Sequence, residues 1–276
     1  IGHPIKHSLS PIMHNALINS LSNRNDEYKD WAYFKFDIQP DHLQQALKLF
    51  YEKKFLGLNL TVPHKVKALD FTKVISNEAI NVGAINTLKW TQSGYEGFNT
   101  DGYGLSRAII NDFDLNLENN NILIIGAGGA ARAAVVESLN NSCDSIFIKN
   151  RSSERLDALL NDIIHLDPNK KISRFESETV LPSNGVVINA TSIGLNQDDP
   201  IPIDFNLIPQ SWAIYDMFYS PSETNLVKQA KQLGYQASMG LSMLSFQGAK
   251  SFEIWAEETF DHALMLNYLD EHIKNI

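Results

Sequence analysis

The sequence of 276 residues contains only one cysteine, Cys143. A single cysteine can form neither an internal disulfide nor a cysteine-rich metal site, so we expect the chain to work in a reducing cytoplasm. No apolar run approaches the ~20 residues of a membrane-spanning helix, and no signal peptide is evident. Positive charge is in deficit: the formal net charge is −9, which argues against nucleic acid as a partner. No cluster of histidine or acidic residues indicates a metal site.

The sequence nevertheless has enough apolar residues for more than one core. Apolar residues make up 43% of the chain and charged residues 20%, as is typical of globular proteins. A chain of this length can form two domains of ordinary size. Its first residue is Ile1 rather than Met, which leaves open that an upstream strand is missing from the sequence.

A strand, a glycine-rich turn and a helix follow one another directly at residues 122–136. The turn, Gly-Ala-Gly-Gly-Ala-Ala at 126–131, fits the G-x-G-x-x-G/A pattern of dinucleotide-binding domains. Glycine allows the tight turn and the close approach of the backbone to a pyrophosphate, and the helix N-terminus offers N–H groups to the phosphates. Glycine turns also join ordinary strands and helices, but this context predicts a dinucleotide site at Gly126, Ala127, Gly128, Gly129 and Ala130.

The second strand of this domain indicates which dinucleotide is bound. NAD-selective domains carry Asp or Glu at its end, whereas here the strand at 145–149 runs into Asn150, Arg151 and Ser152, with Arg155 close behind. A guanidinium group offers charge-assisted hydrogen bonds to a 2′-phosphate, and Ser152 can add a hydroxyl at the helix start. A solvated arginine is a plausible alternative for Arg155 alone. The whole group favours NADP.

Strands and helices alternate through the second half of the chain, which predicts a parallel, doubly wound sheet. The expected strands are 121–126, 145–149, 171–175, 186–190, 212–216 and 235–238, and the expected helices are 130–141, 152–165 and 222–233. In the first half we expect a helix capped by Ser10, a strand at 33–38, a helix from Pro40, a strand at 55–62 and a hairpin of 83–90 with 95–99. After Gly240 the pattern is helical again. We therefore expect an α/β protein with domains at 1–103 and 104–240, and with C-terminal helices, 241–276, that return to the first domain.

Several polar residues of the first domain admit two interpretations. Lys65 follows a buried strand directly, and it is either a solvated surface lysine or a functional one. Asp101 is either a helix N-cap or a carboxylate beside a ligand, and Asn86 is either a turn residue or a ligand donor. Ser8 and Ser10, at the start of a helix, could bind a carboxylate through their hydroxyls, or Ser10 could only cap the helix.

Taken together, nine segments resemble the shikimate dehydrogenases of aromatic amino-acid biosynthesis. Thr-Val-Pro-His-Lys at 61–65 and Asn-Thr-Asp-Gly at 99–102 are more specific than the glycine turn. The resemblance covers nearly the whole chain, with segments at 2–11, 59–65, 83–87, 99–102, 126–132, 150–152, 189–192, 215–219 and 247–249.

The resemblance implies reversible, NADPH-dependent reduction of 3-dehydroshikimate to shikimate. Lys65 and Asp101 match the family's catalytic pair, and Met217 and Gly240 match positions near the nicotinamide. The residues that match substrate-binding positions are Ser8, Ser10, Thr61, Asn86, Asp101, Tyr219 and Gln247. Those that match the NADP site are Gly126, Ala127, Gly128, Gly129, Ala130, Asn150, Arg151, Ser152 and Arg155. The family commonly forms dimers, which implies a homodimer here.

Two rival functions remain open at this point. One is a quinate/shikimate dehydrogenase, which would have to accommodate the extra hydroxyl of quinate near Ser8 and Ser10. The absence of an acidic residue at 150 counts against this NAD-using relative. The other is a regulatory protein that binds NADP without turnover, against which the presence of Lys65 and Asp101 argues.

Overall fold

The structure is a computed structural model, and it describes residues 1–194, 198–220 and 222–274. The chain divides into two compact units. Unit 1 comprises Ile1–Gly104 and Leu244–Ile276, and unit 2 comprises Leu105–Met243. The boundaries predicted from the sequence were 103/104 and 240/241. None of the helices in the described ranges combines the length and the apolar composition needed to cross a membrane.

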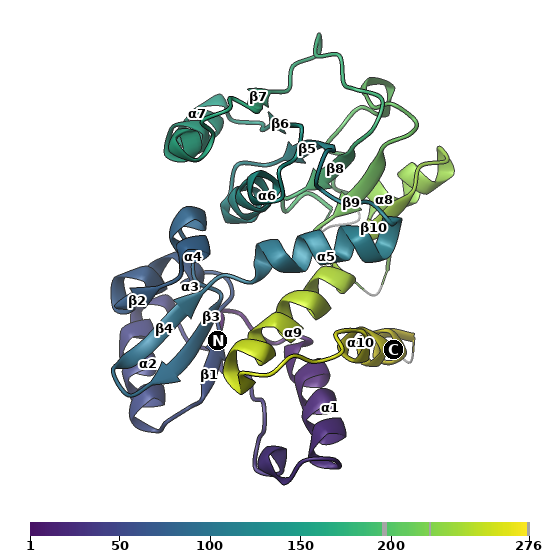
Figure 1. The fold of residues 1–276 in the computed structure, drawn as a ribbon. Helices are drawn as coiled ribbons and strands as arrows, with labels where there is room; N and C mark the ends of the chain where they lie inside the picture. Colours follow the sequence, from purple (N-terminus) through teal and green to yellow (C-terminus); the bar gives the residue numbers. More distant parts are fainter. Residues whose placement is uncertain (195–197, 221, 275–276) are drawn as a thin grey trace. The chain divides into compact units, whose positions relative to one another are not determined.

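Unit 1 is built on a four-stranded sheet with the order β1-β3-β4-β2. The predicted hairpin is confirmed, because β3 and β4 pair in antiparallel fashion around Gln92 and Ser93. Figure 1 shows α1 and α10 side by side, and the two helices are in contact. The C-terminal helices thus pack within unit 1, as the sequence predicted. The elements of unit 1 are α1 (Ser10–Ser22), α2 (Leu43–Glu52), β1 (Gly57–Asn59), α3 (His64–Lys67), β2 (Val74–Ile75), α4 (Asn77–Val82), β3 (Thr87–Thr91), β4 (Gly94–Phe98), α9 (Leu241–Ala256, which begins in unit 2) and α10 (Ala263–Lys274).

The core of unit 1 lies between α2 and the sheet. The apolar residues of α2 recur at helical spacing, and the four on its inner face are all buried. They pack against Leu58 of β1 and Leu88 of β3, which are 5% and 0% exposed. Both strands are therefore anchored in the core. This anchoring matters because polar residues that the sequence marks as candidates for a functional site lie just after β1 and just before β3.

Three local predictions for unit 1 were wrong. Residues 33–38 alternate like a strand but form only an isolated bridge between Gly2 and Asp37, since no longer partner segment lies beside them in the described chain. The strand expected at 55–62 is reduced to β1, because its ladder ends where Asn59 meets Thr87, the first residue of β3. Ser10 does not cap α1: Leu9 is the N-cap, and its carbonyl already accepts from the N–H of residue 12 at 3.0 Å.

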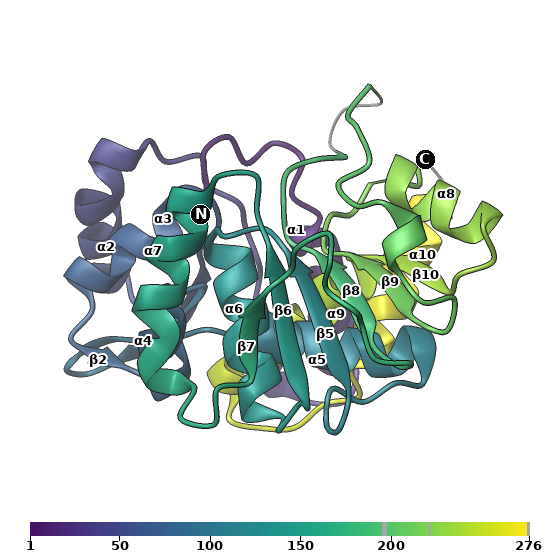
Figure 2. The same ribbon diagram turned by 90° about the horizontal axis from the view of Figure 1, so that it is seen from above.

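Unit 2 is the doubly wound α/β domain that the sequence predicted. Its six strands are all parallel, in the order β10-β9-β8-β5-β6-β7, and Figure 2 shows them in a row. All residues of β5 are buried, because this strand has neighbours on both sides and α6 packs on it. The elements of unit 2 are α5 (Asp101–Phe113, which begins in unit 1), β5 (Asn121–Ile125), α6 (Gly129–Asn140), β6 (Ser145–Lys149), α7 (Ser153–Ile163), β7 (Ile172–Arg174), β8 (Val186–Asn189), β9 (Ala213–Asp216), α8 (Asn225–Gln232) and β10 (Ala237–Met239).

The predicted helices of unit 2 differ from the observed ones mainly at their ends. The helix expected at 222–233 begins only at Asn225, because Thr224 caps it by accepting a hydrogen bond from the N–H of Val227. The helix expected at 152–165 ends at Ile163 and continues as a 3₁₀ turn at Ile164–Leu166. The same helix, α7, begins at Ser153, and Ser152 lies before it as its N-cap rather than inside it.

Candidate active site

Lys65 and Asp101 form an ion pair in unit 1. Lys65 lies in the short helix α3, which follows β1, and Asp101 is the first residue of α5, which follows β4. The Nζ atom of Lys65 lies 2.6 Å from Oδ2 of Asp101, with the side chains 29% and 15% exposed. Asp101 lies inside the helix rather than at the cap position before it, and its carboxylate accepts hydrogen bonds from the side chains of Lys65 and Asn86. Lys65 is therefore more than a solvated lysine, and both side chains are available to a ligand.

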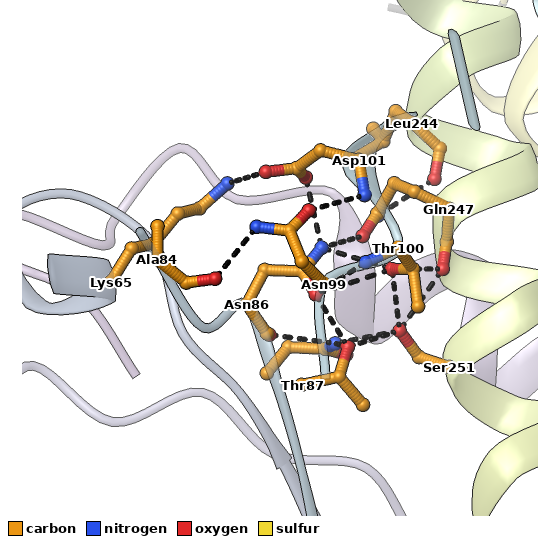
Figure 3. Close-up of polar contacts among 11 residues, drawn as sticks. Lys65, Ala84, Asn86, Thr87, Asn99, Thr100, Asp101, Leu244, Gln247 and Ser251 are labelled. Atoms are coloured by element: carbon orange, nitrogen blue, oxygen red, sulfur yellow. Dashed lines mark hydrogen bonds and ion pairs between the residues drawn. The ribbon is translucent and has the colours of Figure 1, made fainter. Parts of the chain in front are cut away.

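Asn86 is oriented by its neighbours so that its amide group points at Asp101. The backbone N–H of Thr100 can only donate, and it lies 2.9 Å from Oδ1 of Asn86. The amide nitrogen must then lie on the other side, where it donates to Oδ1 of Asp101 at 2.9 Å. Of the two carboxylate oxygens of Asp101, Oδ2 thus accepts a hydrogen bond from Lys65 and Oδ1 accepts one from Asn86 (Figure 3).

Gln247 of α9 completes this group. Its Nε2 atom donates to the carbonyl of Leu244 at 2.9 Å, which turns Oε1 toward the Nδ2 atom of Asn86 at 3.4 Å. Figure 3 shows Lys65, Asn86, Asp101 and Gln247 converging from separate elements. These four residues, selected from the sequence, thus lie together in unit 1.

Thr61, Ser8 and Ser10 are the remaining residues predicted for substrate binding in unit 1. Thr61 follows β1, and its carbonyl accepts the N–H of His64 at the start of α3. Ser8 and Ser10 are neighbours: Oγ of Ser8 lies 3.4 Å from the N–H of Ser10. Burial raises the pKa of the Tyr33 hydroxyl, and a hydrogen bond with Ser10 opposes that shift. The same hydroxyl donates to Oδ1 of Asn59 at 2.8 Å.

Four polar residues behind Asn86 are not among the site residues predicted from the sequence. Asn59, Thr87, Thr100 and Ser251 share hydrogen bonds of 2.7 to 3.2 Å. One signal was available, because Ser251 follows Gln247 by four residues and so lies on the same face of α9. The pairing of Ser251 with Thr87, 164 residues away, has no local signal.

In unit 2 the glycine turn joins β5 to α6, where the fingerprint requires it. Gly126 has a φ of +126°, which L side chains rarely adopt, and a Cβ there would lie 3.0 Å from the carbonyl oxygen of Ala190. Gly128 and Gly129 are exposed, and a Cβ on either would meet no atom within 4 Å. Gly128 is the N-cap of α6, and it has no side chain that could accept a hydrogen bond from the first N–H groups of the helix. The first N–H groups of the helix are therefore open to an anion.

The end of β6 carries the residues predicted to select NADP. Arg151 and Arg155 are exposed, and Nδ2 of Asn150 donates to the carbonyl of Ser152 at 2.9 Å. The hydroxyl of Ser152 accepts the N–H of Arg155 at 3.2 Å and donates to Glu154 at 2.7 Å. This hydrogen bond holds the pKa of Glu154 below its usual value. Glu154 was not noted in the sequence, and it places a negative charge beside the predicted phosphate site.

Met217 and Gly240 are in close contact at the ends of β9 and β10. The N–H of Gly240 donates to the carbonyl of Phe218 at 2.9 Å, and a Cβ on Gly240 would lie 2.2 Å from the carbonyl oxygen of Met217. Only glycine fits at this position. Tyr219 follows, and burial raises the pKa of its hydroxyl.

Asp216 was not predicted as a functional residue, although it lies in the segment 215–219 that also contains Met217 and Tyr219. It is 0% exposed and accepts hydrogen bonds from Nδ2 of Asn189, the hydroxyl of Thr224 and the N–H of Phe218. Burial raises the pKa of its carboxyl group, while these hydrogen bonds oppose the shift. Asp216 thereby fixes the turn that carries the residues after β9. Within the described ranges, no group of three or more His, Cys, Asp or Glu side chains could hold a metal ion.

Comparisons with known proteins agree on one family. The family model described as the shikimate dehydrogenase substrate binding domain matches residues 1–88, and the model described as shikimate / quinate 5-dehydrogenase matches residues 108–196. A curated relative, the shikimate dehydrogenase (NADP(+)) of Methanococcus aeolicus, is 34% identical over 97% of this chain and 94% of its own.

Solved structures share the fold of this chain. Shikimate 5-dehydrogenase from Thermus thermophilus, in complex with NADP(H) and shikimate, superimposes with a TM-score of 0.82 at 30% identity, over 98% of this chain and 97% of its own. The ligand-free 5-ketofructose reductase of Gluconobacter sp. strain CHM43 has a TM-score of 0.84 at 28% identity, over 98% of this chain and 96% of its own. The near-complete coverage by relatives above 30% identity shows that the chain belongs to the shikimate dehydrogenase family.

Proposed function

We propose that this protein catalyses the reversible, NADPH-dependent reduction of 3-dehydroshikimate to shikimate in the biosynthesis of chorismate and the aromatic amino acids. The observation that carries the proposal is the ion pair of Lys65 with Asp101, held in place by Asn86. It occurs in a chain whose curated relatives are shikimate dehydrogenases that use NADP.

Lys65 and Asp101 can handle the one proton that the reaction moves. Bound NADP supplies the hydride chemistry, so the protein must orient the substrate and protonate or deprotonate its hydroxyl. The ammonium group of Lys65 has three protons, of which one is directed to Asp101. The others can be donated to the substrate oxygen, where negative charge develops during reduction. Among the described residues each oxygen of Asp101 accepts one hydrogen bond, which leaves a lone pair on each for the substrate hydroxyl.

The residues of unit 2 are suited to NADP. The exposed glycines at the start of α6 leave room for the diphosphate against free N–H groups. Arg151 and Arg155 are exposed at the end of β6, where a 2′-phosphate needs a positive partner. We assign the diphosphate to residues 126–130, the 2′-phosphate to Asn150, Arg151, Ser152 and Arg155, and the nicotinamide to the neighbourhood of Met217 and Gly240.

The two serines before α1 are the basis for the substrate assignment. Their hydroxyls can bind the carboxylate of shikimate, which 5-ketofructose lacks. Thr61, Tyr219 and Gln247 are assigned to the substrate as well. In this proposal residues 1–103 bind and convert the substrate, residues 104–240 bind NADP, and helices 241–276 complete the substrate domain. The homodimer and the cytoplasmic location expected above stay predictions.

The test follows reduction of the cofactor, to NADPH or NADH, with shikimate, quinate or fructose as the alcohol and with NADP or NAD as the oxidant. We expect the highest kcat/KM for shikimate with NADP. Preference for quinate or for NAD would favour the quinate/shikimate dehydrogenase alternative, and preference for fructose a ketose reductase. Binding of NADP without turnover of any alcohol would favour a regulatory protein.

The catalytic assignment is tested by Lys65→Ala with Lys67→Ala as its matched control. Lys67 lies in the same helix, where its Nζ atom donates to the carbonyl of Pro40 at 3.0 Å. Loss of a proton-transferring group lowers kcat by roughly 10²–10⁴-fold, so we expect such a loss for Lys65→Ala and a change of at most about twofold for Lys67→Ala. Near-normal kcat in Lys65→Ala would show that the assignment is wrong.

A further inference from the structure

A group of three buried hydroxyls lies directly behind Asn86. We call Thr87, Thr100 and Ser251 the hydroxyl cluster; the three residues are 0%, 2% and 0% exposed. They come from the start of β3, the segment before α5 and the middle of α9. In Figure 3 the cluster lies on the side of Asn86 away from Lys65. Its members are too far from Lys65 in the hydrogen-bond chain to act on it directly, so any effect must pass through Asn86.

The hydroxyl of Thr87 has three hydrogen-bond partners in the described chain. Its Oγ1 atom lies 3.1 Å from Nδ2 of Asn59, which can only donate, and 2.7 Å from Oγ of Ser251. The Ser251 hydroxyl also lies 3.0 Å from the carbonyl of Gln247, to which it can donate its one proton. The third partner, Oδ1 of Asn86, can only accept, so in the hydrogen bond of 2.8 Å that joins the two side chains the Thr87 hydroxyl is the donor.

The Asn86 amide therefore receives two donors on its oxygen, the Thr87 hydroxyl and the N–H of Thr100. With both in place, the opposite side of the amide presents its N–H groups, one of which meets Oδ1 of Asp101 at 2.9 Å. A rotated amide would place its oxygen against the Asp101 carboxylate, where two acceptors face each other without a proton between them. The hydroxyl of Thr87 thus disfavours the rotated amide of Asn86, in which the amide oxygen would repel the carboxylate of Asp101.

We propose that Thr87 is a positioning residue for the reaction: its hydroxyl holds the Asn86 amide in the orientation that keeps Asp101 aligned with Lys65. Asn59 and Ser251 support it through their hydrogen bonds with the Thr87 hydroxyl, and in the first of these Asn59 is the donor. The inference rests on the proposed function for its kinetic consequence, but the orientation of Asn86 can be observed without turnover.

The backbone of Thr87 makes a clean substitution available. Thr87 pairs with Asn59 of β1 and with Phe98 of β4, so both of its edges are held in the sheet. Valine has the same branched shape and strand preference but no hydroxyl. Thr87→Val therefore removes the proton on Asn86 and keeps the strand, and Thr87→Ser keeps the hydroxyl and removes only a methyl group.

Thr72 supplies the matched control for the loss of a buried hydroxyl. It is 8% exposed in the same unit, and its Oγ1 atom donates to the carbonyl of Ala68 at 2.8 Å, with no bond to the site. Thr72→Val should lower the melting temperature as Thr87→Val does, because each leaves buried polar partners without a hydrogen bond. Only Thr87→Val should lower kcat. We expect a decrease of roughly tenfold, which corresponds to the free energy of one hydrogen bond. Thr87→Ser should keep kcat within about twofold of wild type.

A second measurement observes Asn86 itself. The side-chain amide resonance of Asn86, assigned by its loss in Asn86→Ser, should exchange slowly with solvent in the wild type and in Thr87→Ser, and rapidly in Thr87→Val. Equal kcat values for Thr87→Val and Thr72→Val would overturn the proposal. So would a Thr87→Ser enzyme as impaired as Thr87→Val, or an unchanged Asn86 resonance in Thr87→Val. If the wild type turned over none of the alcohols, the proposed function would fail, and the resonance would still decide the role of Thr87.

Discussion

The buried histidine of α1, His14, should make the protein less stable as the pH falls. His14 is 0% exposed and is packed among aromatic rings: Tyr33 is stacked on it at 4.2 Å between centroids, and Trp255 lies at 5.5 Å. Among the residues that the structure describes, neither ring nitrogen has a hydrogen-bond partner. Burial alone lowers the pKa of His14 from 6.5 to about 3. The folded protein thus requires a neutral ring.

The size of the effect follows from the two pKa values. They differ by 6.5 − 3 = 3.5, which at ~1.36 kcal/mol per pH unit amounts to about 5 kcal/mol if the pH falls below both values. Because the pKa is lowered in the fold, the unfolded chain binds more protons between pH 6.5 and 3, and stability declines as the pH falls through that window. Between pH 7 and pH 5 the loss due to His14 is about 2 kcal/mol.

The variant His14→Leu, of similar volume, removes this dependence. We expect its free energy of unfolding to fall by about 2 kcal/mol less than that of the wild type between pH 7 and pH 5. Urea unfolding followed by tryptophan fluorescence measures it, since Trp31, Trp90 and Trp255 all lie in unit 1. Other titrating groups, such as His64, remain in both proteins and cancel in the comparison.

A substitution of the exposed His42 in the same unit provides the control for losing a histidine. His42→Leu should behave like the wild type at both pH values, because its ring is not packed in the core. If His14→Leu and the wild type lost the same stability between pH 7 and pH 5, the ring of His14 would have to accept a proton inside the fold. A water or a rearrangement would then supply the missing partner, and the reasoning from burial would be refuted.

Two further predictions concern the cofactor. Gly240→Ala should lower the melting temperature and raise the KM for NADP, because its Cβ would lie 2.2 Å from the carbonyl oxygen of Met217; an unchanged KM would remove Gly240 from the nicotinamide site. Glu154→Gln should lower the KM for NADP by roughly two- to fivefold at low salt but leave that for NAD unchanged, because it removes a negative charge next to Ser152. Glu178→Gln is the control, since Glu178 also accepts a hydrogen bond from a neighbouring serine, and an equal effect in both variants would exclude a local cause.

Unit 2 could be predicted from the sequence because its signals are local. Parallel strands buried on both faces read as apolar runs, and the helices between them have clear caps, such as Ser152 and Thr224. The glycine turn depends on backbone conformation at Gly126, which the residue type itself indicates. Observed and predicted elements of this unit therefore differ mainly at their ends.

Unit 1 was less predictable, because its elements depend on partners far away in sequence. Residues 33–38 have the alternation of a strand, but alternation does not reveal whether a neighbouring strand exists to pair with. The helix start near Ser10 shows the same limit at shorter range: Leu9 caps the helix through its backbone carbonyl, although serine is the better capping side chain.

The candidate site shows the same contrast between signals that are local in the sequence and contacts with residues that are distant in it. Lys65, Asn86 and Asp101 could be selected because they match a family, but pattern alone left each with an ordinary structural alternative. Their geometry depends on Ser251, which contributes to the site only because α9 returns to unit 1. The direction of a hydroxyl proton, on which the role of Thr87 depends, is a property of three partners together and has no counterpart in any one segment.

The two sites should consequently respond to substitution in different ways. The proposed NADP site relies on backbone N–H groups at the start of α6, so in this proposal residues such as Ala127 and Ala130 can change side chain without removing a donor, provided that the glycine conformation at 126 is kept. The site around Asp101 uses side chains that share hydrogen bonds, so the loss of one hydroxyl leaves several donors and acceptors unmatched at once. Effects of paired substitutions within the second site should be non-additive, whereas substitutions in separate units should combine additively.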